Sequence, residues 1–99
     1  MIMETYSHIS RASYLGNFMI HIEFKNGEQR ILDCSSWLKE NMGDFEDLKK
    51  EENFKLFQIK NGLLVWPNGY DLAPEYSYQN SRPYYFESGK LVYNINAAQ

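Results

Sequence analysis

The sequence predicts an α+β fold, in which β-hairpins alternate with short helices, and three observations lead to this prediction. Asn26-Gly27 and Asn61-Gly62 each separate two stretches of alternating apolar residues, which is the pattern of a tight hairpin. Residues 35–48, which lie between these stretches, carry helix-capping and helix-stopping residues instead. The segment after Tyr76 is rich in aromatic residues and is typical of a third hairpin.

The chain has the size and composition of a single domain. Its 99 residues are 43% hydrophobic and 23% charged, which is ordinary for a globular domain that buries one core. We expect residues 1–76 to form the core of this domain, and residues 77–99 to form a C-terminal aromatic hairpin that extends it.

The first hairpin is predicted to close with a two-residue type I′ turn, because Asn26-Gly27 readily adopts the positive φ angles of that turn. This turn sets Glu23 opposite Arg30 and Ile22 opposite Ile31. It leaves a buried stripe of alternate residues, namely Phe18, Ile20, Ile22 and Phe24.

The second hairpin is predicted around Asn61-Gly62 by the same reasoning. Its register sets Ile59 opposite Leu64 and Phe57 opposite Trp66. Pro67 then ends the ladder, because proline has no backbone N–H to donate.

Four shorter elements complete the expected fold. Residues 5–14 are predicted to add an edge strand. Ser35-Ser36 is expected to cap a short helix that Gly43 stops, and Asp44 to cap a further turn. Pro74 is expected to begin a last short helix, since a residue without an N–H costs nothing at that position.

Charge and cysteine content exclude several classes of function. A formal net charge of -3 and a pI near 5.3 oppose binding to nucleic acid or to an anionic bilayer. The single cysteine excludes an intrachain disulfide and favours a reducing, cytoplasmic setting. The first residues lack the pattern of a signal peptide, and no apolar run is long enough to span a membrane.

The segment from Trp66 to Glu75 has the pattern Trp-Pro-Asn-Gly-x-Asp-Leu-x-Pro-Glu. With the hairpin before it, this pattern resembles the small bacterial domain-of-unknown-function 2442 family over residues 6–76. The resemblance implies a curved, mainly antiparallel sheet with two or three short helices and no established activity. It also implies a context like that of toxin–antitoxin pairs, in which the chain binds the product of an adjacent gene.

Trp66, Asn68, Tyr70 and Asp71 are candidate binding residues in this motif. In a recognition loop, Trp66 would anchor a partner and Asp71 would accept hydrogen bonds from an arginine. The alternative is a scaffold, in which Trp66 packs in the core and Asp71 ties the turn.

Tyr84, Tyr85 and Tyr93 are further candidates, in the C-terminal segment. They suit a protein interface, or they are half-buried strand residues. Base stacking is disfavoured, because only Arg82 and Lys90 are near enough to supply a basic groove.

No residues group into a catalytic or metal site. The predicted register sets His21 opposite Leu32 and Cys34 opposite Met19, which does not cluster ligands. The sequence has neither a nucleophile motif nor a phosphate-binding loop. We therefore expect no catalytic residue, no metal and no cofactor.

Three hypotheses for function follow. The first is a non-enzymatic protein-interaction module, antitoxin-like or regulatory, whose partner is a small basic protein. The second is a small ligand-binding protein or hydrolase with a site that the sequence does not reveal. The third is a structural homodimer formed through a sheet edge.

Overall fold

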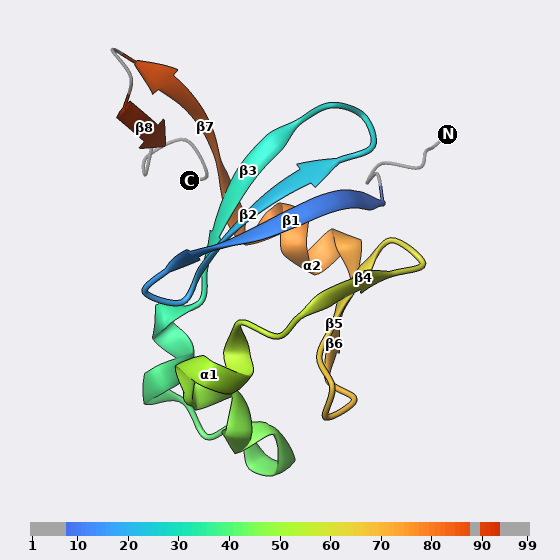
Figure 1. Cartoon of the computed structure of the whole chain (residues 1–99), viewed down its shortest axis with the longest axis vertical. Coiled ribbons are helices and arrows are strands. Elements are labelled where there is room, and N and C mark those ends of the chain that lie inside the picture. The colour runs from blue at the N-terminus through green and yellow to red at the C-terminus, as the bar shows by residue number, and fades with distance from the viewer. Residues whose placement is uncertain (1–7, 88–89, 94–99) are drawn as a thin grey trace.

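The computed structural model describes residues 8–87 and 90–93, and their strands form two antiparallel sheets (Figure 1). The larger sheet has the order β1-β2-β3-β7-β8, and the smaller one β4-β5-β6. The strands of the larger sheet are β1 (Ile9–Gly16), β2 (Met19–Phe24), β3 (Gln29–Asp33), β7 (Ser81–Glu87) and β8 (Lys90–Tyr93). Those of the smaller sheet are β4 (Gln58–Lys60), β5 (Leu63–Val65) and β6 (Asp71–Leu72).

Short helices connect these strands. Two of them are 3-10 helices, η1 (Ser35–Lys39) and η2 (Gly43–Lys49), and two are α-helices, α1 (Glu51–Phe54) and α2 (Pro74–Gln79). In Figure 1, η1, η2 and α1 lie together at the bottom of the picture, below the larger sheet. The predicted α+β class is confirmed. No described helix has the length and apolar character that crossing a membrane requires.

Strand β2 begins at Met19, one residue later than predicted, because Phe18 belongs to the turn before it. Asn17 and Phe18 have φ angles of 54° and 62°, and Gly16 pairs with Met19, so these two residues form the tight turn between β1 and β2. The prediction that Phe18 belongs to the buried strand stripe is therefore wrong. Its half-buried ring packs against Phe54 instead, with ring centroids 4.9 Å apart.

The β2–β3 turn has three residues rather than the predicted two. The N–H of Gly27 donates to the Phe24 carbonyl at 2.9 Å, and the N–H of Phe24 donates to the Glu28 carbonyl at 2.9 Å. Gly27 has φ +92°, whereas Asn26 does not have positive φ, as expected of a type I turn followed by a glycine bulge. The predicted type I′ turn at this position is wrong.

This extra loop residue moves the register of β3 by one position. Ile22 faces Arg30 instead of Ile31, and the predicted pair of Glu23 with Arg30 is wrong. Glu23 instead accepts from Arg11 of β1 at 2.6 Å. Ile20, Ile22 and Phe24 are buried, as predicted.

The second hairpin confirms its prediction. Asn61 and Gly62 have φ angles of 53° and 82°, and Ile59 pairs with Leu64. The predicted pair of Phe57 and Trp66 lies just beyond the ladder, where the two rings are 6.0 Å apart. The carbonyl of Gly62 accepts from the N–H of Ile9 at 3.0 Å, which joins the tip of this hairpin to β1.

The predicted caps of the first two helices are wrong, whereas the predicted start of the last helix is confirmed. Ser35 and Ser36 lie inside η1, whose first N–H donates to the Asp33 carboxylate at 2.9 Å. Gly43 begins η2 rather than ending the preceding helix, so the predicted cap at Asp44 is also wrong. Pro74 is the first residue of α2, as predicted.

The edges of the larger sheet match the sequence expectation. β1 is an edge strand, although residues 5–7 of the predicted strand lie outside the described residues. β7 pairs with β3 on one side and with β8 on the other, so the strand pairing expected of a third hairpin is present. Residues 77–79 of the predicted extension belong to α2 instead, and its residues 88–89 and 94–99 lie outside the described residues.

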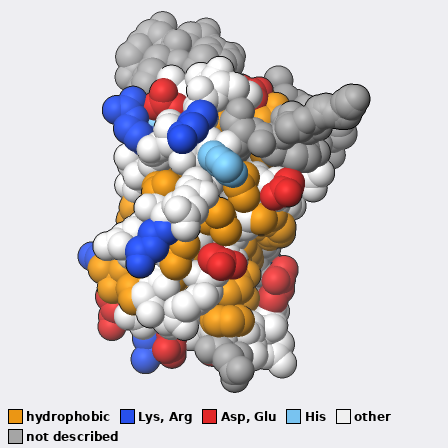
Figure 2. All heavy atoms as spheres, turned by 90° about the vertical axis from the view of Figure 1, so that its right-hand side faces the viewer, with side chains coloured by type: hydrophobic (Ala, Val, Ile, Leu, Met, Phe, Trp, Pro, Cys, Tyr) orange, Lys and Arg blue, Asp and Glu red, His pale blue; other side chains and the backbone are white. Residues whose placement is uncertain are grey.

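The core lies between the two sheets and the helices. Its largest fully buried side chains include Trp66, Phe24 and Phe54. The face that carries the β4–β5 hairpin, on the right-hand side of Figure 1, gathers hydrophobic side chains over its middle (Figure 2).

Candidate functional site

Trp66 lies in the core and not on the surface. Its side chain is 1% exposed, and its indole Nε1 donates to the carbonyl of Phe54 at 2.6 Å. Its ring also packs against those of Trp37 and Phe57, with centroids 6.0 Å away in each case. The residue that the sequence suggested as an anchor therefore supports the loop that follows it.

The turn after Trp66 is closed by its own asparagine. The N–H of Gly69 donates to the Trp66 carbonyl at 2.9 Å, and Asn68 Oδ1 accepts from the N–H of Tyr70 at 3.0 Å. In the scaffold alternative, the sequence predicted that Asp71 rather than Asn68 would close this turn. Because the Asn68 oxygen is occupied, its Nδ2 group is left to donate elsewhere.

Tyr70 and Asp71 take different positions beyond this turn. The half-buried Tyr70 ring packs against Phe45 at 4.4 Å and against Trp37 and Trp66 at 5.7 Å each. Burial raises the pKa of the Tyr70 hydroxyl, so it stays protonated at neutral pH. Asp71 is exposed and pairs with Val65 in the smaller sheet.

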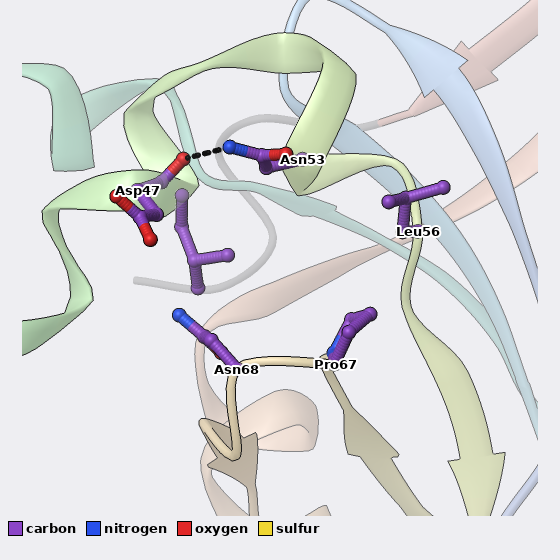
Figure 3. Close-up of a pocket in the computed structure, with 6 residues that line it drawn as sticks. Asp47, Asn53, Leu56, Pro67 and Asn68 are labelled. Atoms are coloured by element: carbon purple, nitrogen blue, oxygen red, sulfur yellow. Dashed lines mark hydrogen bonds between the residues drawn. The ribbon is translucent and has the colours of Figure 1, made fainter.

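A small pocket lies between this turn and the helices η2 and α1 (Figure 3). Its volume is about 110 Å³. We call it the Asn68 pocket, and it is lined by Asp47, Leu48, Asn53, Leu56, Pro67 and Asn68. Of the side chains that the sequence singled out for binding and that the structure describes, only Asn68 lines it.

Hydrogen bonds hold the pocket walls in place. Asn53 Nδ2 donates to the Asp47 carbonyl at 3.2 Å, which joins α1 to η2 (Figure 3). The bond from Trp66 to Phe54 joins the base of the turn to the end of α1. Figure 3 shows the Asn68 amide nitrogen pointing from the turn toward the wall that contains Asp47.

The helical arm, residues 35–54, carries the net negative charge of the chain. It contains six acids and three lysines, whereas the rest of the chain contains seven acids and seven bases. Among the acids of the arm whose side chains the structure describes, Glu46 pairs with Lys49 at 3.1 Å and Glu51 accepts from the Tyr14 hydroxyl at 2.5 Å. The exposed Asp47 carboxylate has no hydrogen-bond or ionic partner among the described residues.

Comparison with known proteins identifies the family. The family model described as "Protein of unknown function (DUF2442)" matches residues 9–83. The chain belongs to this family. Among curated proteins and among solved structures, nothing matches the chain. All six residues that line the Asn68 pocket lie within the part of this DUF2442 protein that the family model covers.

Asp47, Asn53 and Leu56 are pocket residues that the sequence did not reveal. The only signal was that Asp47 lies in a polar, acidic stretch, a pattern that usually means a solvated face. Asn53 and Leu56 reach the pocket only because α1 folds back toward the turn after Trp66.

Tyr84, Tyr85 and Tyr93 are placed by their backbone pairing alone. Tyr84 pairs with Tyr93, and Tyr85 pairs with Val92. Their side chains lie outside what the structure describes.

The two histidines and the single cysteine lie apart. His21 Nε2 lies 3.1 Å from Gln29 Oε1 on the larger sheet, whereas His8 lies against Gly62. Cys34 is buried, and its burial raises the pKa of the thiol to about 12. Within residues 8–87 and 90–93, no three His, Cys, Asp or Glu side chains group as metal ligands.

Proposed function

We propose that this DUF2442 protein is a non-enzymatic protein-interaction module that binds and regulates a small basic protein, in the manner of an antitoxin. The partner is the product of an adjacent gene in a bacterial cytoplasm. One observation carries the proposal, namely the location of the whole net charge of -3 in the helical arm that forms one wall of the Asn68 pocket.

The charge of the arm suits association with a basic surface. Complementary charge raises the rate of encounter and disfavours partners of like charge. The effect is local here, because acids and bases balance over the rest of the chain. A basic partner is therefore drawn toward the arm and the adjoining pocket.

Apolar side chains beside these charges supply contact area. Leu38 lies in the arm and is 46% exposed, and Leu56 lies two residues after the arm and is 49% exposed. Apolar contacts inside a charged rim are the usual composition of a non-obligate protein interface.

The state of the single cysteine, Cys34, supports binding rather than catalysis. A nucleophilic cysteine needs a lowered pKa and access to substrate. Cys34 has a raised pKa of about 12 and is buried in the core. Tyr70, beside the pocket, likewise has a raised pKa, so neither group is activated for attack or for proton abstraction near neutral pH.

Co-expression with the product of the neighbouring gene tests this proposal. We expect a complex that survives affinity purification, whose association rate falls as salt increases. The variant Glu40→Gln with Glu52→Gln removes two charges from the arm, and Glu75→Gln on α2 is the control. For each charge removed, the arm variant is expected to slow association more than the control. Absence of a complex, or equal slowing by both variants, would contradict the proposal.

A further inference from the structure

We propose that the Asn68 pocket holds one arginine side chain of the basic partner. This inference rests on the proposed function and specifies how the partner is recognised. The volume of about 110 Å³ is well below the roughly 300 Å³ or more of a site for a small-molecule ligand. The pocket is therefore of a size to accept a single side chain.

The apolar lining fits the stem of a long cationic side chain. Leu48 is 2% exposed and closes the pocket on the side of the arm, whereas Leu56 and Pro67 line the opposite side. Arginine and lysine cover apolar surface with their methylene groups and keep the charged group near water. The exposed position of Leu56 provides such a surface at the mouth of the pocket.

Two acceptor groups favour a guanidinium group as the head of that side chain. The Asp47 carboxylate has no partner among the described residues and stands at the pocket. Asn53 donates its Nδ2 to the Asp47 carbonyl, which leaves its Oδ1 free to accept. A guanidinium has several donors in a planar fork and suits acceptors that lie in different directions, whereas an ammonium acts as a point charge.

Asn68 provides the complementary contact to the backbone of the partner. Its Oδ1 already accepts from the N–H of Tyr70, so its Nδ2 donates toward the pocket, as Figure 3 shows. A cation would not accept this hydrogen bond, but the carbonyl of the residue that carries the cation would. The pocket thus offers acceptors for a side-chain head and a donor for a main-chain carbonyl.

The test is a titration of the ¹⁵N-labelled protein with the capped peptide Ac-Gly-Arg-Gly-NH₂, followed in ¹H–¹⁵N spectra. The side-chain amide signals of Asn53 and Asn68 are expected to shift and to saturate. The peptide with citrulline in place of arginine keeps the shape and loses the charge, so we expect its affinity to fall by at least about fivefold. The lysine peptide is expected to bind less tightly than the arginine peptide.

Two charge-neutralising variants separate pocket binding from general attraction to the arm. Asp47→Asn alters the pocket, and Glu52→Gln removes the same charge from an exposed position of the arm that does not line it. We expect Asp47→Asn to weaken binding of the arginine peptide by about fivefold and Glu52→Gln to weaken it less than twofold. Equal loss in both variants, equal binding of arginine and citrulline peptides, or no saturation up to about 10 mM peptide would overturn the inference.

The same variants, measured with the co-purified partner, distinguish the two proposals. If the complex forms and Asp47→Asn weakens it no more than Glu52→Gln does, the proposed function stands and the arginine pocket is wrong. If no partner complex forms while the arginine peptide binds at Asn68, the pocket recognises arginine and the proposed function is wrong.

Discussion

The indole Nε1 of Trp66 and the carbonyl oxygen of Phe54 are joined by a hydrogen bond of 2.6 Å. The bond connects the segment just after β5 to the last residue of α1, and both side chains are buried. Because Asn68 and Pro67 follow Trp66 and Asn53 precedes Phe54, this bond fixes both walls of the Asn68 pocket from beneath. The indole is thus a structural element whose loss also affects the pocket.

Replacing Trp66 tests this role. In Trp66→Phe the carbonyl of Phe54 loses its donor inside the core, so we expect a loss of roughly 1–3 kcal/mol in the free energy of unfolding. Trp66→Ala also leaves a cavity and is expected to cost roughly 3–5 kcal/mol. Urea unfolding followed by circular dichroism measures both. The control Leu38→Ala truncates an exposed side chain and is expected to change stability by less than about 0.5 kcal/mol. A Trp66→Phe variant as stable as the wild type would show that the bond is dispensable.

Gly62 and Gly69 have similar φ angles but different surroundings, so their alanine variants can be compared. Gly62 and Gly69 have φ angles of +82° and +96°, but a Cβ at Gly62 would lie 2.5 Å from His8 Cβ, whereas a Cβ at Gly69 meets nothing within 4 Å. Gly69→Ala is therefore expected to cost only the backbone strain, roughly 1–2 kcal/mol. Gly62→Ala is expected to cost more, because the hairpin tip must move away from the chain before β1.

Comparison of the two melting temperatures, or of the two unfolding free energies, checks this expectation. The difference between the variants measures the contact between the β4–β5 hairpin and the start of the larger sheet. Equal destabilisation would mean that His8 and Gly62 are not in contact in solution.

The three Asn-Gly dipeptides show what could be predicted from the sequence. The turns predicted at Asn26-Gly27 and Asn61-Gly62 are present, and Asn68-Gly69 also forms a turn, but only Asn61-Gly62 forms the two-residue type I′ turn. At Asn26 and Asn68 the side-chain oxygen instead accepts from the N–H two residues later, at 2.9 and 3.0 Å. This local hydrogen bond competes with the type I′ turn, so the Asn-Gly dipeptide alone does not decide the turn type.

That choice has a large consequence for Arg30. In the predicted register its side chain would pair with Glu23 on the surface, whereas the observed register turns it to the face of Ile22, where it is 8% exposed. The Asn68 pocket could not be predicted from the sequence, because it also depends on contacts between distant parts of the chain. Asp47 and Asn68 are far apart in the chain, and only the position of α1 against the turn brings them together.

The buried guanidinium of Arg30 leads to a further prediction. Its Nε and NH2 groups donate to Ser81 Oγ at 2.8 Å and to the Ser81 carbonyl at 2.7 Å, and its charge lies 4.2 Å from the centre of the Tyr78 ring. Ser81→Ala leaves a buried donor of a charged group without its acceptor, so we expect a loss of roughly 1–3 kcal/mol. Arg30→Met removes the charge together with its requirement for hydrogen-bond acceptors. Because methionine is apolar and of similar volume, this variant is expected to cost less stability than Ser81→Ala.

A double-mutant cycle of Arg30→Met and Ser81→Ala checks the argument by urea unfolding. In the Arg30→Met background, Ser81→Ala is expected to cost clearly less than in the wild type, because the donor that it orphans is gone. Strictly additive losses would contradict the proposed dependence between the two side chains.

The raised pKa of the Cys34 thiol predicts that stability falls at alkaline pH. Burial, and secondarily the charge of Asp33, raises the pKa of the folded thiol from 9.0 to about 12. Between these two values the unfolded chain has lost the thiol proton and the folded chain retains it, so the unfolded state binds fewer protons and stability falls as pH rises. The contribution of this one group is on the order of 1.4 kcal/mol per pH unit above pH 9. The free energy of unfolding of the wild type and of Cys34→Ala is measured at pH 8, 9 and 10, a span of about two units. The difference between the two proteins isolates the contribution of the thiol, because the tyrosines titrate in both. The stability of the wild type relative to Cys34→Ala is expected to fall as pH rises. If this difference in the free energy of unfolding does not depend on pH, the thiol ionises as readily in the folded protein as in the unfolded chain.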